Sequence, residues 1–170
     1  MKGAAILQKE RRNVGISLYG TGSTEKELKE LAASEGADNV TFHGRVSPDE
    51  AFRASSRAMA QIVALQPSPL FRMSVPSKLL FSFAAGAPLI YALEGEAAEM
   101  ARASGGAFEF EARSPESFAA AVRKLMDTPV AERNAMRSAL RAHYRENFSS
   151  DVLLRKYLHV LAPDLGEAAA

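Results

Sequence analysis

The segment most able to do chemistry spans residues 71–78, FRMSVPSK, between a predicted strand and a predicted helix. Because proline is tolerated in the first turn of a helix, the helix is expected to begin near Pro76. The free amides of that turn, two hydroxyls and two cations could together surround a diphosphate. The side chains concerned are Arg72, Ser74, Ser77 and Lys78. A capped helix with a solvated lysine accounts for the same residues equally well.

A second candidate is the turn YGTGS over 19–23, between a predicted strand and a predicted helix. Gly20 and Gly22 would let the backbone approach a ligand, and the amides of a helix N-terminus favour an anion such as a phosphate. The dinucleotide-binding pattern GxGxxG is incomplete, because Glu25 stands at the third glycine position. An ordinary tight turn is the alternative interpretation.

The remaining polar residues form no recognisable catalytic or metal-binding pattern. The histidines at 43, 143 and 159 are isolated, and the arginine-rich stretch 133–145 is predicted to be a solvated helix face. Carboxylates at 94, 96 and 99 follow a predicted strand, where they could accept a hydroxyl of a sugar or ribose. They could equally complement the dipole of the following helix. We therefore assign no catalytic residue, no metal ligand and no cofactor.

These segments are expected to be positioned by alternating strands and helices. The predicted strands are 14–19, 39–43, 59–65, 88–93 and 107–110, and 66–75 is predicted to be a long loop. The predicted helices are 3–12, 25–34, 48–57, 76–85, 96–104, 115–126, 131–146 and 151–161. This order predicts an α/β, Rossmann-like three-layer domain over 1–162, with a mostly parallel sheet of about five strands and a C-terminal helical tail. Residues 163–170 are predicted to be a frayed end.

The composition and charge of the chain argue against several classes of protein. The 170 residues include no cysteine, which excludes a disulfide framework and a thiol nucleophile. A net charge of +1 is too balanced for a protein that must neutralise many phosphates, so we expect no nucleic-acid partner. The apolar runs fall short of the roughly 20 residues that span a bilayer. A cytoplasmic protein without a transmembrane segment is expected.

The order of the motifs is similar to that of a known family. Residues 18–50, LYGTGSTEKELKELAASEGADNVTFHGRVSPDE, and 75–100, VPSKLLFSFAAGAPLIYALEGEAAEM, resemble segments of retaining GT-B glycosyltransferases, family 4 in particular. The second segment looks like the P-S-K-x2-E-Y-x-A-A-G-x-P pattern of the lipopolysaccharide and capsule enzymes. The helices predicted over 115–161 resemble the helices that close the family's fold.

The resemblance implies a domain that binds a nucleoside diphosphate sugar. It places the donor diphosphate and sugar against residues 74–78, including Val75 and Pro76, and the nucleobase near Arg45. Lys2 resembles the family's diphosphate-neutralising lysine. The family commonly carries two glutamates eight residues apart for the sugar and the ribose, and these positions hold Met73 and Phe81 here. Neither side chain accepts a hydroxyl hydrogen bond usefully.

We therefore expect the donor-binding half of a glycosyltransferase that moves a sugar to a hydroxyl acceptor, without a metal, in surface polysaccharide synthesis. The resemblance also implies that the family's first strand and its N-terminal acceptor domain are missing, so that the chain alone is inactive. The full enzyme would lie in the cytoplasm or on the inner membrane surface. An unpaired sheet edge would tend to find a partner, homo-oligomers included. The alternatives are a non-catalytic binding module and an unrelated Rossmann-like enzyme such as an epimerase.

Overall fold

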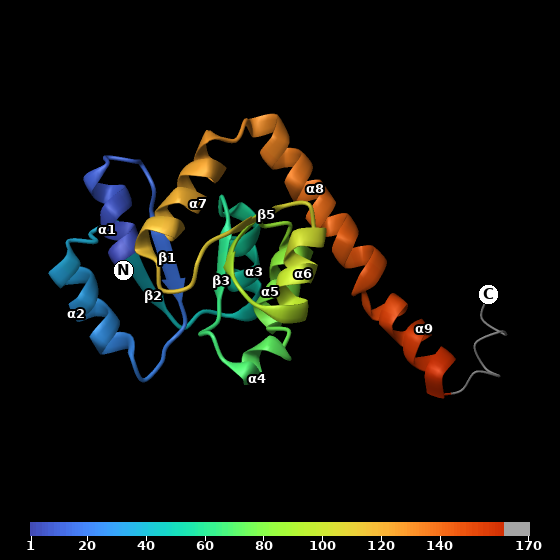
Figure 1. Ribbon diagram of the computed structural model, residues 1–170. Helices are drawn as coiled ribbons and strands as arrows, with labels where there is room; N and C mark the ends of the chain where they lie inside the picture. Colours follow the sequence, from blue (N-terminus) through green and yellow to red (C-terminus); the bar gives the residue numbers. More distant parts are fainter. Residues whose placement is uncertain (162–170) are drawn as a thin grey trace.

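The computed structural model describes residues 1–161 and shows parallel strands alternating with helices (Figure 1). The strands are β1 Ile16–Tyr19, β2 Val40–Gly44, β3 Gln61–Ala64, β4 Leu89–Ala92 and β5 Ala107–Glu109. The helices are α1 Lys2–Lys9, α2 Glu25–Glu35, α3 Pro48–Arg57, α4 Pro69–Arg72, α5 Ser77–Ala85, α6 Gly95–Ala103, α7 Pro115–Asp127, α8 Val130–Asn147 and α9 Ser150–Leu161. The predicted α/β class and the C-terminal helical tail are confirmed. The frayed end predicted over 163–170 lies outside the described residues.

Local sequence signals set several helix boundaries. Ser47 and Glu50 form a capping box at the start of α3, in which each side chain satisfies a backbone amide of the other. Gly36 ends α2 in the left-handed conformation, as Gly86 ends α5. Thr24 is the N-cap of α2, and its side chain makes no capping hydrogen bond.

The strands form two sheets, which corrects the expectation of one. β1 pairs with β2, and β3, β4 and β5 form a second sheet; all pairings are parallel. Neighbouring strands must lie about 4.8 Å apart to share hydrogen bonds. Between β1 and β3 lies instead a groove, lined by the side chains of Ile16, Leu18 and Ile62.

Helices cover the β3–β4–β5 sheet on both faces. Leu7 of α1 and Val122 of α7 pack with Ile90 on one face. On the other face, Phe83 of α5 and Leu140 of α8 pack with Tyr91 and with alanines of α6. Helices α1 and α2 also cover one face of the β1–β2 sheet. The predicted three layers are therefore present.

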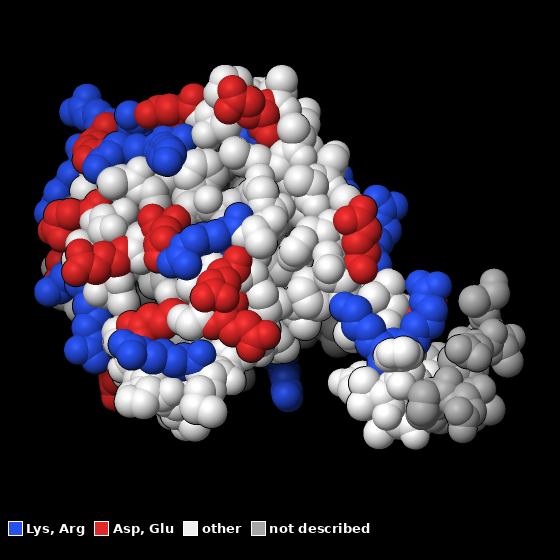
Figure 2. Space-filling view, turned by 45° about the vertical axis from the view of Figure 1, so that its right-hand side comes forward, with Lys and Arg blue, Asp and Glu red and all other residues white. Residues whose placement is uncertain are grey.

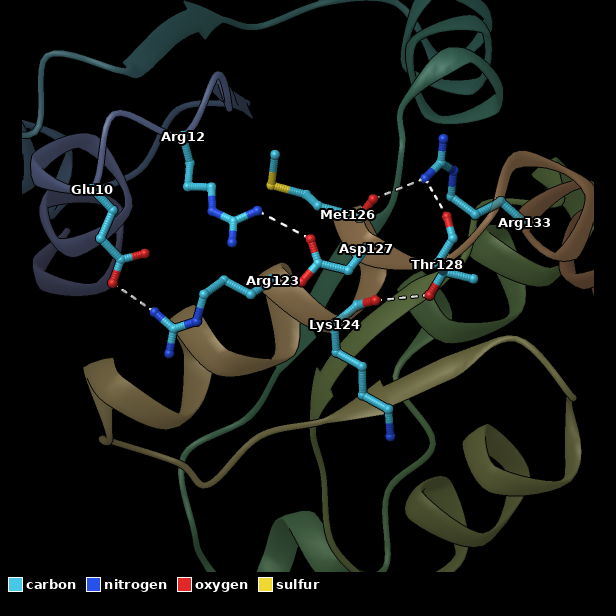
Figure 3. Close-up of polar contacts among 8 residues, drawn as sticks. All are labelled: Glu10, Arg12, Arg123, Lys124, Met126, Asp127, Thr128 and Arg133. Carbon is cyan, nitrogen blue, oxygen red and sulfur yellow. Dashed lines mark hydrogen bonds and ion pairs between the residues drawn. The ribbon is translucent and has the colours of Figure 1, made fainter.

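Helix α7 links α1 to α8 through polar contacts (Figure 3). Arg12 pairs with Asp127 at 3.0 Å, and Arg123 pairs with Glu10 at 2.7 Å. Exposed ion pairs contribute little individually. Together with the apolar contacts of α1 and α7, they connect the β1–β2 sheet to the rest of the domain.

Two expectations about local structure are wrong. The predicted loop over 66–75 contains the short helix α4, because Pro69 occupies a first-turn position where its missing N–H costs nothing. The stretch 133–145 is only partly a solvated face. Arg133 donates to the carbonyls of Met126 and Thr128, and Arg137 donates to backbone carbonyls of other elements.

Helix α9 continues beyond α8 and projects from the domain (Figure 1). Its large apolar side chains include Leu154, Tyr157, Val160 and Leu161, all well exposed. Within residues 1–161, no helix is long and apolar enough to cross a membrane.

Candidate functional site

The predicted site residues fall into two groups that follow the carboxyl ends of strands. Gly20, Gly22 and Arg45 follow β1 and β2, whereas residues 72–78 follow β3. Loops in these positions are where ligands bind in open parallel sheets. Lys2 belongs to neither group.

The first group is built around a contact between two glycines. The amide of Gly20 donates to the carbonyl of Gly44 at 2.6 Å, which places Arg45 beside the β1–α2 turn. Gly20 has φ +115°, a conformation open to glycine. Tyr19 and His43 stack there with ring centroids 4.4 Å apart, and His43 Nε2 lies 3.1 Å from Ser17 Oγ.

The electrostatics of this turn are unfavourable for a phosphate. The first turn of α2 carries two carboxylates, Glu25 and Glu27, which already complement the positive end of the helix. Glu25 is paired with Lys29 at 2.7 Å, so Glu27 is the carboxylate of this turn that would repel an anionic ligand. The first group is therefore better suited to a neutral part of a ligand.

The second group has the opposite character. Helix α5 begins at Ser77, has Pro76 as its N-cap, and lacks both a side-chain cap and an acidic residue in its first turn. Lys78 lies in that turn and is exposed, as are Ser74 and Ser77. Val75 is half-buried against the core and fixes the end of the loop. Free amides, two hydroxyls and a cation thus gather at the positive end of a nine-residue helix.

Arg72 differs from Lys78 because its charge is already paired. Its Nε lies 2.5 Å from Oε2 of Glu94, which precedes α6. The pair lines a hollow of about 200 Å³ at the carboxyl ends of β3, β4 and β5. Arg72 therefore anchors α4 to α6, and Lys78 is the more available cation for a ligand.

Lys2 and the two positions that lack the family's glutamates have surroundings of their own. Lys2 Nζ lies 3.9 Å from a Glu35 carboxylate oxygen, and Lys2 lines the groove between β1 and β3. Met73 is 87% exposed in the turn after α4. Phe81 packs edge-to-face on Phe52 of α3, with centroids 5.6 Å apart, so its side chain serves the α3–α5 contact.

One polar group near the hollow was not predicted from the sequence. The hydroxyl of the buried Tyr91 donates to Glu109 at 3.3 Å, and Arg102 pairs with Glu109 at 3.1 Å. Burial, and then the charge of Glu109, raise the pKa of Tyr91, so the phenol stays a proton donor at neutral pH. Tyr91 lies in the apolar run PLIYAL, and no local pattern marks it as a polar contact.

The position of α4 depends on Gly95. It has φ +62°, and a β-carbon there would overlap the carbonyl oxygen of Arg72. We predict that Gly95→Ala forces α4 away from α6, and that it destabilises the fold by about 1–3 kcal/mol beyond the left-handed strain. Hydrogen exchange at the hydrogen-bonded amides of residues 71–74 should become faster.

Gly105→Ala is the matched control for this prediction. Gly105 has φ +72°, but its nearest neighbour for a β-carbon is an ordinary contact at 3.6 Å with Ala139. It carries the same backbone strain, about 1–2 kcal/mol, without the clash. Equal exchange rates at 71–74 in both variants would show that Gly95 does not position α4.

The surface charges and the possible metal ligands of residues 1–161 point to no further site. Acidic and basic side chains are intermixed on the face drawn in Figure 2, where the described residues form no continuous basic stripe. Among residues 1–161, no three His, Asp or Glu side chains are grouped so that they could hold a metal ion.

The sequence over residues 2–128 matches the family model described as glycosyl transferases group 1. The chain belongs to this family. Among solved structures, its fold is similar to a glycosyltransferase from Rickettsia africae, with a TM-score of 0.73, 18% identity, and coverage of 93% of this chain and 42% of that chain. No curated protein matches the sequence significantly.

Two further solved structures have a similar fold. WaaG, a glycosyltransferase involved in lipopolysaccharide biosynthesis, has a TM-score of 0.68, 20% identity, and coverage of 95% of this chain and 41% of its own. HepE of Anabaena, solved with UDP, has a TM-score of 0.75, 17% identity, and coverage of 95% and 44%. This glycosyl transferases group 1 chain therefore spans less than half the length of these three proteins whose fold it shares. The prediction that the chain is related to the GT-B glycosyltransferases is confirmed.

Proposed function

We propose that this chain is the donor-binding part of a retaining, family 4 type glycosyltransferase. The reaction would transfer a sugar from a nucleoside diphosphate sugar to a hydroxyl acceptor in surface polysaccharide synthesis. Membership of the glycosyl transferases group 1 family supports sugar transfer. The UDP bound to HepE supports a nucleotide donor, and the lipopolysaccharide role of WaaG supports the biosynthetic setting.

The N-terminus of α5 is the observation that carries this proposal. It combines free amides, no acidic first-turn residue and the exposed Lys78. In sugar transfer, negative charge develops on the departing diphosphate, and positive groups fixed near it lower the barrier. Lys78 and the α5 amides would stabilise that charge, with the hydroxyls of Ser74 and Ser77 as donors.

The other predicted residues would bind the rest of the donor. The turn at Gly20 and Arg45, where α2 is acidic, would hold the neutral nucleobase side. Glu94 lines the hollow beside Arg72 and is the candidate acceptor for a hydroxyl of the sugar or ribose. This would replace the carboxylates that Met73 and Phe81 do not provide.

A calorimetric titration with UDP, GDP and ADP tests the proposal on the full 170-residue chain. We expect one of them to bind, and Lys78→Ala to weaken binding about 10- to 100-fold, since a hydrogen bond to a charged group contributes about 1.5–3 kcal/mol. Lys9→Ala, an exposed lysine at the far end of α1, is the control and should change affinity less than about twofold.

No transfer to an acceptor is expected from this chain by itself. Related structures are more than twice its length, and a cleft between two domains requires both. Robust turnover of a nucleotide sugar by the purified chain would contradict this expectation.

A non-catalytic binding module is the second candidate. The absence of carboxylates at Met73 and Phe81, with Phe81 committed to the contact with Phe52, favours it. If none of the three nucleotides binds, the donor-binding proposal is wrong and the module remains. If one binds and Lys78→Ala behaves like Lys9→Ala, the assignment of the diphosphate to Lys78 is wrong.

A further inference from the structure

An aromatic stack stands at the carboxyl ends of β1 and β2. The rings of Tyr19 and His43 are parallel within 8°, with their centroids 4.4 Å apart. His43 Nε2 lies 3.1 Å from Ser17 Oγ, a contact that holds the imidazole in place behind the phenol. Tyr19 is nevertheless 45% exposed. Because a stacked neighbour covers only one face of a ring, the other face of Tyr19 is open to a planar ligand.

The pairing of the two strands explains why this ring is presented to solvent. Phe42 of β2 packs with alanines of α1 and α2, and alternation along the strand places His43 on the opposite, exposed face. The register of the ladder shifts between Leu18 and Tyr19, so that Gly44 lies opposite Tyr19. Irregularities of this kind redirect a side chain, and a glycine offers no side chain to cover it.

The surroundings of the stack suit an uncharged part of a ligand. Glu27, in the first turn of α2, would repel a phosphate there, whereas the start of α5 carries Lys78 and no acidic residue. A nucleoside diphosphate has both kinds of group, an anionic diphosphate and an uncharged planar base. The stack and the start of α5 each follow the carboxyl end of a strand, where ligands bind in open parallel sheets.

We propose that the base of the donor nucleotide stacks on the open face of Tyr19. This inference rests on the proposed function, which supplies the nucleotide and places its diphosphate at the start of α5. Every base has a π-face, so the stack contributes to the affinity for UDP, GDP and ADP alike. The choice among bases then depends on hydrogen bonds at the base edge, for which Arg45 beside the same turn is the candidate.

The test compares ligands with and without a base on the full 170-residue chain. UDP, GDP, ADP and inorganic diphosphate are titrated by calorimetry into the unaltered protein and into Tyr19→Ala. We expect Tyr19→Ala to weaken nucleotide binding about 5- to 100-fold, because it removes one base–aromatic stack. The affinity for inorganic diphosphate should change less than about twofold. Lys78→Ala, in contrast, should weaken the binding of both kinds of ligand.

Two further variants separate stacking from an effect on the fold. Tyr19→Phe keeps the ring and should bind nucleotide within about twofold of the unaltered chain. Tyr157→Ala is the matched control, because it removes a tyrosine that is 63% exposed on α9, and it should leave every affinity unchanged.

The ring of Tyr19 also gives a signal that does not depend on affinity. Its aromatic proton resonances can be recognised among those of the four tyrosines by their absence from the spectrum of Tyr19→Phe. We expect the ring current of a stacked base to shift them when nucleotide binds, and inorganic diphosphate to leave them in place.

The possible results distinguish this inference from the proposed function. If a nucleotide binds the unaltered chain and binds Tyr19→Ala equally well, the stacking inference is wrong while the donor-binding proposal stands. Equal weakening of nucleotide and diphosphate binding, or Tyr19 resonances that do not move when nucleotide binds, would overturn the inference in the same way. If none of the three nucleotides binds, both are wrong.

Discussion

Arg137→Met is expected to destabilise the domain by about 3–4 kcal/mol, because one guanidinium serves the C-terminal ends of two helices. Arg137 donates to the carbonyls of Ser56 and Ala58 at the end of α3, and to the carbonyl of Gly86 at the end of α5. Burial, and then the charges of Arg141 and Arg133, lower the pKa of Arg137, which stays protonated at neutral pH. Its removal would leave three partly buried carbonyls without their donor. Urea unfolding measures the loss.

Arg145→Met is the control for this prediction. Arg145 is exposed on the same helix and its side chain makes no hydrogen bond or ion pair with the described residues. Arginine and methionine have similar helix propensities, so the change should cost less than about 0.5 kcal/mol. Arg137→Lys should fall between the two, because a lysine keeps the charge but not the planar fork. Equal losses for Arg137→Met and Arg145→Met would show that the contacts contribute nothing.

The direction of the arginine side chains within residues 133–145 could be predicted from the sequence only in part. The composition of this stretch predicts a solvated face, and the exposed Arg145 agrees. The inward direction of Arg133 and Arg137 depends on where α3, α5 and α7 end, which no pattern within 130–147 contains. Long-range placement therefore decides the role of each arginine.

Strand and helix positions could be predicted because their signals are local. The capping box of Ser47 and Glu50 begins α3, and the left-handed Gly36 ends α2. The division of the five strands into a β1–β2 sheet and a β3–β4–β5 sheet could not be predicted from such local signals. Whether β1 and β3 share hydrogen bonds depends on what lies between them, not on the residues of either strand.

The candidate site was predictable only in part. The polar segment 74–78 does lie at the start of a helix, and its electrostatics follow from the residues present. The pairing of Arg72 with Glu94 joins positions 22 residues apart in the chain. The sequence predicts Arg72 and Lys78 as joint phosphate ligands, whereas the ion pair with Glu94 occupies the charge of Arg72 alone. Phosphate binding by either residue stays a prediction.

The surroundings of Gly86, the glycine of the A-A-G-x-P pattern, explain why a larger residue would not fit there. A matched pair of variants can test this explanation. Gly86 ends α5 with φ +64°, and a β-carbon there would lie 2.9 Å from the carbonyl oxygen of Arg137. Gly36 ends α2 with φ +68°, and nothing lies within 4 Å of a β-carbon at that position. The two residues share the same backbone conformation and differ in their surroundings.

Gly36→Ala should therefore cost about 1–2 kcal/mol, the strain of a left-handed alanine. Gly86→Ala should cost a further 1–3 kcal/mol or so, because α8 must move away from α5 and overpacking of a fixed contact is destabilising. Urea unfolding of both variants measures the difference. If the two lose the same free energy, the close approach of α8 is not what requires glycine at this position. If Gly86→Ala loses more, and combining it with Arg137→Met costs less than the two separate losses, then Gly86 and Arg137 stabilise one shared junction between α5 and α8.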